Sequence, residues 1–278
     1  GSQHVAAYGP LWNAGGERGI YKTTDGGKTW NQVLKVSDNT GFNEVHIDNQ
    51  HPNIIYACAH QRRRHEWAYI SGGPESAVYK STDNGTTWNK LSNGLPTGDV
   101  GRIGLAISPV NTDIVYAIVE GRDNKGFYKS SDRGASWTKQ SSYSTDGNYY
   151  QEIVADPLNA DKVYSMATWA QVSKDGGKSF SGLGEKSKHV DNHAMWIDPT
   201  VPNHYLIGCD GGLYESFDGA ETWDFKSNLP ITQFYRVCVD NVKPFYNVYG
   251  GTQDNNTLGG PGRTMSASGI TNSDWFVT

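Results

Sequence analysis

The sequence predicts an all-β protein, a β-propeller of four-stranded blades, and three observations carry this prediction. A nine-residue string with Asp at its fourth position recurs along the chain at intervals of about 40 to 60 residues. A strand-like apolar segment follows each copy of the string at a nearly constant distance. No long window keeps the helical period of about 3.6 residues, so helices should be almost absent.

The copies of the string differ in detail but keep the same order of residue types. They are KTTDGGKTW (22–30), KSTDNGTTW (80–88), KSSDRGASW (129–137), VSKDGGKSF (172–180) and ESFDGAETW (215–223). Their aspartates are Asp25, Asp83, Asp132, Asp175 and Asp218. The apolar segments that follow them cover 45–59, 105–119, 153–167, 195–209 and 237–251. A repeat of this length, made of short β-rich segments, is typical of one propeller blade.

Each blade is expected to contain four strands, named a to d from the centre outward. In the clearest repeat these are NEVHID (43–48), IIYACAH (54–60), AVYKSTD (77–83) and TTWNKLS (86–92). The blades are expected at 3–36, 37–90, 91–141, 142–184, 185–228 and 229–278. The first of them lacks an a strand. The prediction is therefore a single propeller domain of five to six blades, or an incomplete propeller.

The repeated string is interpreted as the turn between strands c and d. An Asp carboxylate accepts backbone N–H groups across such a turn, and glycines supply its positive φ angles. The aromatic residue of the string begins strand d and packs between sheets. Symmetry-related carboxylates on separate blades cannot all meet one substrate, so a structural role is predicted for each. The last copy has Ala220 where the others have Gly, which predicts an altered turn there.

These strings resemble the Asp-box (BNR repeat), Ser/Thr-x-Asp-x-Gly-x-Ser/Thr-Trp/Phe, of sialidases, sortilin-type receptors and several propeller glycosidases. Longer stretches are similar to large bacterial sortilin-like, Asp-box proteins that are often labelled glycosyl hydrolases; they include GERGIYKTTDGGKTW, GDVGRIGLAISP, HVDNHAMWIDP and LPITQFYRVCVDN. The resemblance implies a secreted protein, either extracellular or in the periplasm or cell envelope. It also implies a fragment of a larger parent chain.

Composition excludes some classes of partner. The 278 residues carry a net charge of −5, and the longest basic run is at 62–64, which argues against nucleic acid. No apolar stretch approaches the roughly 18 residues that a membrane-spanning helix needs. Cys58, Cys209 and Cys238 each lie in a strand-like apolar run, so buried free thiols are favoured over a single disulfide.

The alternation of antiparallel strands sorts the connections onto two ends of the blades. The a–b and c–d turns share one end, and the b–c and d–a loops share the other, which we call the loop face. The variation in loop length falls in the b–c loops, at 9–19, 61–76, 121–126 and after residue 250. Binding residues concentrate on variable loops that a rigid scaffold holds. We therefore expect a glycan or peptide ligand on the loop face.

The loop face contains arginine and aromatic candidates for ligand binding. The principal candidates are Trp12, Arg62, Arg63, Trp67 and Arg236. Further aromatic candidates are Tyr149, Tyr150 and Tyr235. Arginine suits a carboxylate, a phosphate or an anionic sugar. The alternative for the arginines of the 61–76 loop is charge pairing with Glu66 and Glu75. For Arg102 and Arg236, near or on inner strands, inter-blade ion pairs are favoured over an anion site.

The segment HVDNH places His189, Asp191 and His193 at alternate positions. If the loop is extended, all three side chains point to the same side. Two imidazoles and a carboxylate suit zinc or another transition metal, and no cofactor beyond such a divalent metal is indicated. The favoured alternative is a hydrogen-bonded loop anchor, with Asp210 as the nearest partner by topology.

Two functions from different classes remain. Asp210 and Asp254 occupy equivalent b–c positions on neighbouring blades, and carboxylates about 5 to 9.5 Å apart act as an acid–base pair in glycosidases. The alternative is that both satisfy tight Gly-rich turns. GRIGLA lacks the proline of the sialidase Arg-Ile-Pro segment, and the Asp-Ile-Gly-Gly stretch of xyloglucan-cleaving propellers is missing. We therefore favour a sortilin-like binding module over a glycoside hydrolase of polysaccharides whose catalytic carboxylates lie outside these residues.

Overall fold

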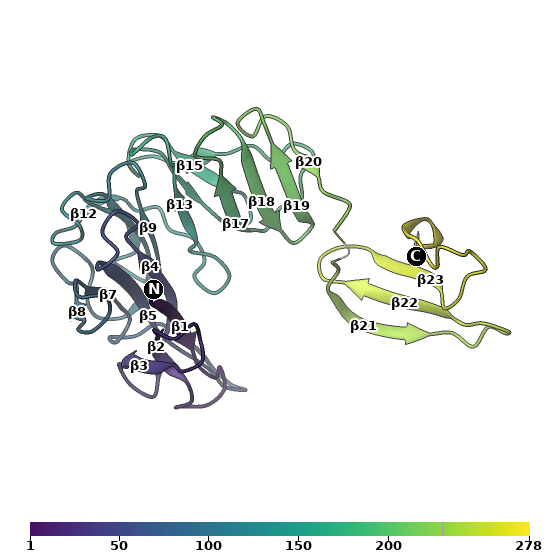
Figure 1. Ribbon diagram of the computed structural model, residues 1–278, viewed down its shortest axis with the longest axis horizontal. Coiled ribbons are helices and arrows are strands. Elements are labelled where there is room, and N and C mark those ends of the chain that lie inside the picture. The colour runs from purple at the N-terminus through teal and green to yellow at the C-terminus, as the bar shows by residue number, and fades with distance from the viewer. Residues whose placement is uncertain (230) are drawn as a thin grey trace.

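The computed structural model describes residues 1–229 and 231–278, and it consists almost entirely of antiparallel strands (Figure 1). In these residues the helical structure is one 3₁₀ turn, Asn272–Asp274. None of the described helical structure is long and apolar enough to cross a membrane. The prediction of an all-β chain with almost no helix is confirmed, and the arrangement of the sheets is that of an incomplete β-propeller.

The strands form successive sheets along the chain. The first sheet contains β1 (Gln3–Tyr8), β2 (Arg18–Thr23) and β3 (Asn31–Leu34). The second contains β4 (Thr40–Ile47), β5 (Ile55–Arg64), β7 (Ala77–Ser81) and β8 (Asn89–Lys90), with β6 (Tyr69–Ser71) paired to the end of β5. The third contains β9 (Val100–Ile107), β10 (Val115–Gly121), β11 (Gly126–Ser130) and β12 (Thr138–Ser141).

The remaining three sheets repeat the four-stranded order. The fourth contains β13 (Ile153–Ala155), β14 (Val163–Ser165), β15 (Gln171–Ser173) and β16 (Ser181–Gly182). The fifth contains β17 (Asn192–Ile197), β18 (Tyr205–Cys209), β19 (Gly212–Ser216) and β20 (Asp224–Phe225). The sixth contains β21 (Phe234–Val239), β22 (Asn247–Thr252), β23 (Thr257–Pro261) and β24 (Phe276–Val277).

The hydrophobic core lies between neighbouring sheets of an arc that the first five sheets form (Figure 1). The b strands of the second, third and fourth sheets contain continuous apolar runs because both of their faces are covered, and residues 115–119 of β10 are all fully buried. One core cluster joins Tyr56 and Cys58 of the second sheet to Leu105 and Ala117 of the third. Packing between sheets, rather than within one sheet, therefore sets the spacing of the blades.

The sixth sheet stands apart from the arc in Figure 1. Every residue of β21 is exposed, including Val237 at 59% and Val239 at 58%. Cys58 is buried and Cys209 is partly buried, but Cys238 on β21 is exposed. The expectation of a buried thiol is therefore wrong for Cys238, because no neighbouring sheet covers this face as it covers the b strands of the arc.

The turn of each repeated string, which we call the Asp-box turn after the motif that it resembles, is held by a compact set of hydrogen bonds. Asp83 Oδ1 accepts from the N–H groups of Thr86 (3.0 Å) and Thr87 (2.8 Å), and Oδ2 accepts from the Thr87 hydroxyl (2.6 Å). The buried Ser81 hydroxyl donates to Asp83 and accepts from Gly85 N (2.8 Å). The bond from the N–H four residues on recurs at Asp25 (Thr29), Asp132 (Ser136), Asp175 (Ser179) and Asp218 (Thr222).

These bonds favour the charged carboxylate. The Thr87 hydroxyl and N–H, followed by the Ser81 hydroxyl, lower the pKa of Asp83 to about 2. The other four Asp-box carboxyls have pKa values lowered to about 2 by the equivalent donors. A carboxyl held in its charged form by its own turn is poorly suited to donate a proton to a substrate.

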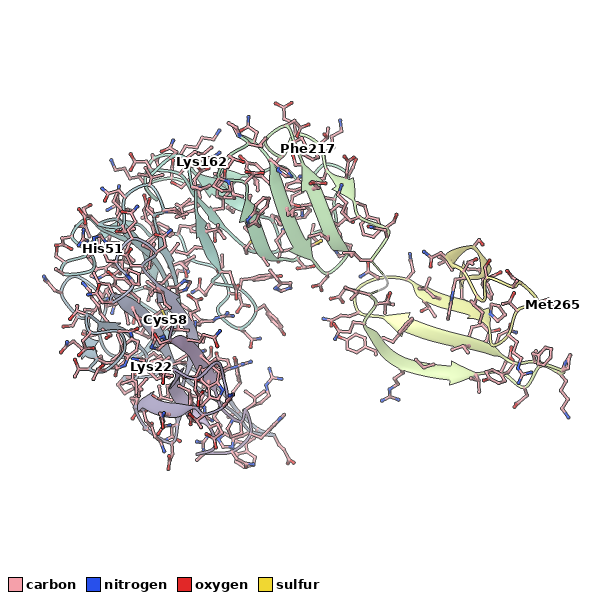
Figure 2. All side chains as sticks on the ribbon, in the orientation of Figure 1. Lys22, His51, Cys58, Lys162, Phe217 and Met265 are labelled. Atoms are coloured by element: carbon pink, nitrogen blue, oxygen red, sulfur yellow. The ribbon has the colours of Figure 1, made fainter. Side chains whose placement is uncertain are left out.

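The lysine that begins each of the first three strings links its blade to the next, and in the third Lys129 Nζ donates to Asp161 Oδ1 of the fourth sheet (2.7 Å). Lys22 Nζ donates to the carbonyl of Asn84 (2.7 Å), which lies in the Asp-box turn of the following sheet. Lys80 Nζ donates in the same way to Arg133 O (2.6 Å). Lys162 at the a–b turn of the fourth sheet reaches Tyr205 of the fifth (3.1 Å), and Figure 2 shows it on the convex side of the arc. The turns therefore fix both the hairpin and the distance between blades.

The last Asp-box turn keeps its form despite its alanine. Ala220 has a φ of 78°, close to the 78° of Gly85 at the equivalent position, and its N–H donates to Ser216 Oγ (2.9 Å). The prediction of an altered turn is therefore wrong. The turn bonds hold Ala220 in a left-handed conformation that costs a non-glycine residue about 1–2 kcal/mol.

We expect Asp83→Ala to lower the melting temperature by about 2–6 °C, because the turn loses its acceptor for two N–H groups and a hydroxyl. A carboxyl with a lowered pKa stabilises the fold fully above its unfolded pKa of about 4, and this contribution is lost as the pH falls towards 2. The variant should therefore lose less stability than the wild type between about pH 4 and 2 in thermal melts. Asp123→Ala, in an exposed b–c loop, is the control; an unchanged melting temperature for Asp83→Ala would contradict the structural role.

Two glycines at the same position of the string should differ sharply in their tolerance of alanine. A Cβ added to Gly27 (φ 89°) would meet no atom closer than 3.9 Å, whereas a Cβ added to Gly177 (φ 92°) would lie 2.2 Å from Cδ1 of the buried Phe127. We expect Gly27→Ala to cost about 1–2 kcal/mol and Gly177→Ala about 1–3 kcal/mol more, measured by urea unfolding. Equal costs would show that the packing against Phe127 does not set the limit.

Candidate ligand-binding face

The loop face carries a series of exposed aromatic side chains from different blades. They are Trp12 (55% exposed), Trp67 (82%), Tyr69 (36%), Tyr149 (61%) and Trp169 (57%). Trp12, Trp67 and Trp169 lie in b–c loops, Tyr69 lies on β6, and Tyr149 lies in a d–a loop. Four of the aromatic candidates from the sequence, Trp12, Trp67, Tyr149 and Tyr235, are thus among the most exposed aromatic residues of the described chain; Tyr235 lies on β21, apart from this series.

The loop that carries Trp12 is built around Arg18. The side chain of Arg18 is 1% exposed and donates to the carbonyls of Tyr8 (2.8 Å), Pro10 and Asn13 (3.0 Å). The buried guanidinium of Arg18 is therefore satisfied by hydrogen bonds to three backbone carbonyls rather than by a carboxylate. Gly9 must lack a side chain here, because a Cβ would lie 2.3 Å from Arg18 Cγ.

The loop that carries Trp67 is the hairpin of β5 and β6, with Arg62–Arg64 paired to Tyr69–Ser71. The Cζ atom of Arg62 lies 5.3 Å from the ring centre of Tyr8 and 5.8 Å from that of Tyr69, and its Nε donates to the Tyr69 hydroxyl (3.1 Å). The rings of His65 and Trp67 are stacked, with centres 5.3 Å apart. The rings of Tyr8 and Tyr69 therefore hold Arg62 in place.

Hydrogen bonds tie the aromatic loops to one another. Arg64 N donates to Leu11 O (2.9 Å), which joins the Trp67 hairpin to the Trp12 loop. The Tyr69 hydroxyl donates to Asn148 Oδ1 (2.6 Å), next to Tyr149. The exposed aromatic side chains of the first four sheets therefore sit on one connected set of loops rather than on independent ones.

Tyr150 continues this set towards the fifth sheet. Its hydroxyl donates to Asp191 Oδ1 (2.5 Å) and lies 3.1 Å from Thr168 Oγ1, and its ring is stacked on that of His193. Burial, followed by the hydrogen bond to Asp191, raises the pKa of Tyr150 to about 12. Tyr150 therefore stays a neutral donor and anchors the loop that precedes β17.

The three HVDNH side chains go to different partners. His189 Nδ1 lies 2.9 Å from the Val190 carbonyl, Asp191 accepts from Tyr150, and His193 Nε2 lies 3.1 Å from Asp210 Oδ1. Asp191 also has a positive φ of 62°, so the loop is not extended as the metal hypothesis requires. In the described part of the chain, no three His, Cys, Asp or Glu side chains gather as metal ligands. The anchor interpretation, with Asp210 as the partner of His193, fits these contacts.

The candidate carboxylate pair lies where the fifth and sixth sheets meet at their b–c loops. Asn255 Nδ2 donates to the backbone carbonyl of Asp210 (3.2 Å). Asp254 occupies the neighbouring turn with a left-handed φ of 51°. The Asp210 carboxylate is already paired with His193, and both aspartates lie in tight turns, as the alternative interpretation of this pair expects.

The arginines near inner strands have different surroundings. Arg102 forms an ion pair with Glu152, which joins the third sheet to the fourth and agrees with the inter-blade pair expected from the sequence. Arg236 lies on β21, is exposed and forms no ion pair within the described residues. The inter-blade ion pair expected for Arg236 is therefore absent there, because the sixth sheet does not pack against the arc along β21.

A buried polar group between the first three blades was not indicated by any motif. Glu120 Oε2 accepts from Arg102 N (3.0 Å), and a Cβ on Gly101 or Gly147 would lie 2.3 or 2.0 Å from the same oxygen. Burial raises the pKa of Glu120. His60 contacts the Tyr8 hydroxyl, and burial followed by the charges of the neighbouring arginines lowers its pKa to about 3. Tyr8 and His60 join β1 to β5 across the first two sheets, and Glu120 joins β10 to β9 within the third.

Comparisons with known proteins place the fold but not the family. No protein-family model matches the chain, and no curated protein matches it. The structure is similar to the crystal structure of the GH74 xyloglucanase from Xanthomonas campestris, with a TM-score of 0.57 and 17% identity over 100% of this chain and 47% of that one. It is also similar to an ancestral GH74 enzyme, with a TM-score of 0.52 and 16% identity over 98% of this chain and 39% of that one. This chain therefore spans less than half of either structure, and the likeness shows a propeller-type fold.

Proposed function

We propose that this chain is a propeller binding module that takes a glycan on the loop face. The observation that carries this proposal is the series of exposed aromatic side chains on hydrogen-bonded loops of successive blades. Large aromatic side chains that are exposed on one face of a molecule mark a site for a partner. Because several blades contribute them, the site suits an extended ligand better than a single small molecule.

Sugars match the chemistry of this face. A pyranose ring has apolar C–H faces that pack on aromatic rings, and hydroxyl groups that need hydrogen-bonding partners. Polar groups lie beside the rings: Asn148 next to Tyr149, and Asp191 beside Tyr150. The loop tethers also limit the conformational entropy that the face loses when a ligand binds. The similar xyloglucanase is named for a polysaccharide, so a polysaccharide is the first ligand to test.

Hydrolysis is the second candidate function, and the contacts support it less well. The carboxylate of Asp210 is paired with His193, and the Asp-box carboxylates are held in their own turns. Glu120 has a raised pKa, as an acid catalyst would. However, the backbone at Gly101 and Gly147 lies against its carboxylate. We propose binding without hydrolysis for this chain, in a secreted or envelope-associated protein, with catalysis left to other parts of any longer parent.

Substitution of the aromatic side chains should weaken glycan binding. We expect Trp12→Ala and Trp67→Ala each to reduce affinity for polysaccharides that a glycan array identifies by about fivefold to tenfold, measured by calorimetry, because each removes one stacking platform. Phe217→Ala is the matched control, since Phe217 is 62% exposed at an Asp-box turn, on the convex side in Figure 2. A reducing-sugar assay on the same polysaccharides should show no release.

Two results would contradict the proposal. If the wild-type protein binds peptides but no glycan when arrays of both are tested, the ligand is a peptide and the proposal is wrong. A loss of glycan binding in Phe217→Ala, with Trp12→Ala and Trp67→Ala unaffected, would move the site to the opposite end of the blades.

A further inference from the structure

We propose that the Trp67 hairpin contains a subsite for the carboxylate of an acidic sugar, so that the glycan bound on the loop face is anionic. This inference rests on the proposed function and names the class of glycan. It starts from a cavity of about 180 Å³ lined by Asn39, Gln61, Arg62, Arg63, His65 and Ile70. A cavity of this size suits one sugar unit or its substituent but not an oligosaccharide.

The lining of the cavity is basic and contains no carboxylate. Within the described residues, Arg62, Arg63 and Arg64 form no ion pair, although the chain as a whole has a net charge of −5. Glu66 and Glu75, the carboxylates expected to pair with these arginines, form no ion pair with them within the described residues. Glu75 accepts hydrogen bonds from Ser37 (2.6 Å) and Thr40. The hairpin (62–71) therefore carries three arginines against one carboxylate, Glu66, and keeps a net positive charge.

The guanidinium groups are held in place but retain free donors. A guanidinium has five N–H donors. Arg62 donates through Nε to the Tyr69 hydroxyl and lies near the faces of two tyrosine rings, and Arg63 donates to Asn39 Oδ1. Side chains that are already ordered by rings and an amide lose little entropy when an anion binds. The remaining donors match the two oxygens of a carboxylate.

The sugar ring itself has a platform beside this cavity. His65 lines the cavity, and the ring of Trp67 is stacked on His65 with 82% of the residue exposed. A uronic acid unit can therefore place its ring on Trp67 while its carboxylate meets the arginines next to it. Elsewhere the net negative charge of the chain disfavours an acidic polymer, so a local basic subsite is needed to hold one.

Matched pairs of oligosaccharides test this assignment. The probes are oligomers of galacturonate, guluronate and mannuronate, each with its carboxyl-reduced neutral form, measured by calorimetry on the full chain. We expect the wild-type protein to bind at least one uronate oligomer about tenfold to hundredfold more tightly than its reduced form. Arg63→Gln and the double variant Arg62→Gln/Arg63→Gln should remove this preference and leave affinity for the reduced form unchanged.

The controls separate this inference from the proposed function. Arg122→Gln, an exposed arginine in the b–c loop of the third sheet, should leave both affinities within about twofold of wild type. Arg62 packs between rings, so Arg63→Gln keeps the test valid if the double variant melts early. Equal binding of charged and reduced forms would overturn the subsite and leave glycan binding standing. No binding of either form would also overturn the subsite, and the glycan array then decides the proposed function separately.

Arg63-dependent binding of poly-glutamate as tight as that of the uronate oligomers would also overturn the inference, because it would identify an acidic peptide as the partner. Raising the salt concentration from about 50 to about 500 mM should weaken uronate binding and spare the neutral form. An equal effect of salt on the two forms would count against a charge-based subsite.

Discussion

The hydrogen bonds of the Asp-box carboxylates are the constraint on which the rest of the structure depends. Each carboxylate gathers donors from its own turn and so fixes where strand c ends and strand d begins. The lysine of the same string then reaches the Asp-box turn of the next blade, as Lys22 and Lys80 do. In these two copies one local motif sets both the hairpin and its distance from the neighbouring hairpin. In the third copy Lys129 bonds to Asp161 of the next sheet instead, and the last two copies begin with Val172 and Glu215, so packing between sheets completes the arc.

The two ends of the blades follow different physical rules. At the Asp-box end, the carboxylate of each short turn is already occupied by donors of its own turn. At the loop face, the tethers are single bonds between loops, such as Arg64 N to Leu11 O and Tyr69 to Asn148. Such tethers hold the backbone in place without covering the side chains, so large aromatic rings stay exposed there. The Asp-box end therefore stabilises the fold, and the loop face is available to a partner.

Arginine shows how strongly the surroundings decide the role of one residue type. Arg18 is buried and satisfied by backbone carbonyls, and Arg102 is paired with a carboxylate across two blades. Arg62 lies near aromatic rings at the edge of a cavity, without a carboxylate. The cost of burying a charge is met by a different partner in the first two cases, and in the third the charge remains available to an anion.

The sequence by itself determined the all-β fold, because the spacing of the repeated string and the apolar segments reflects local turn chemistry and strand burial. It also indicated the inter-blade pairing of Arg102 and the contact of His193 with Asp210, since topology alone places those residues side by side. Only the tertiary structure decided the left-handed turn at Ala220, the separate partners of the HVDNH side chains, and the exposure of Cys238 and Arg236. The group of Glu120, His60 and Tyr8 had no sequence signal at all. Tyr8 and His60 are far apart in the chain, and their contact arises from packing between the first two sheets, which no local pattern encodes.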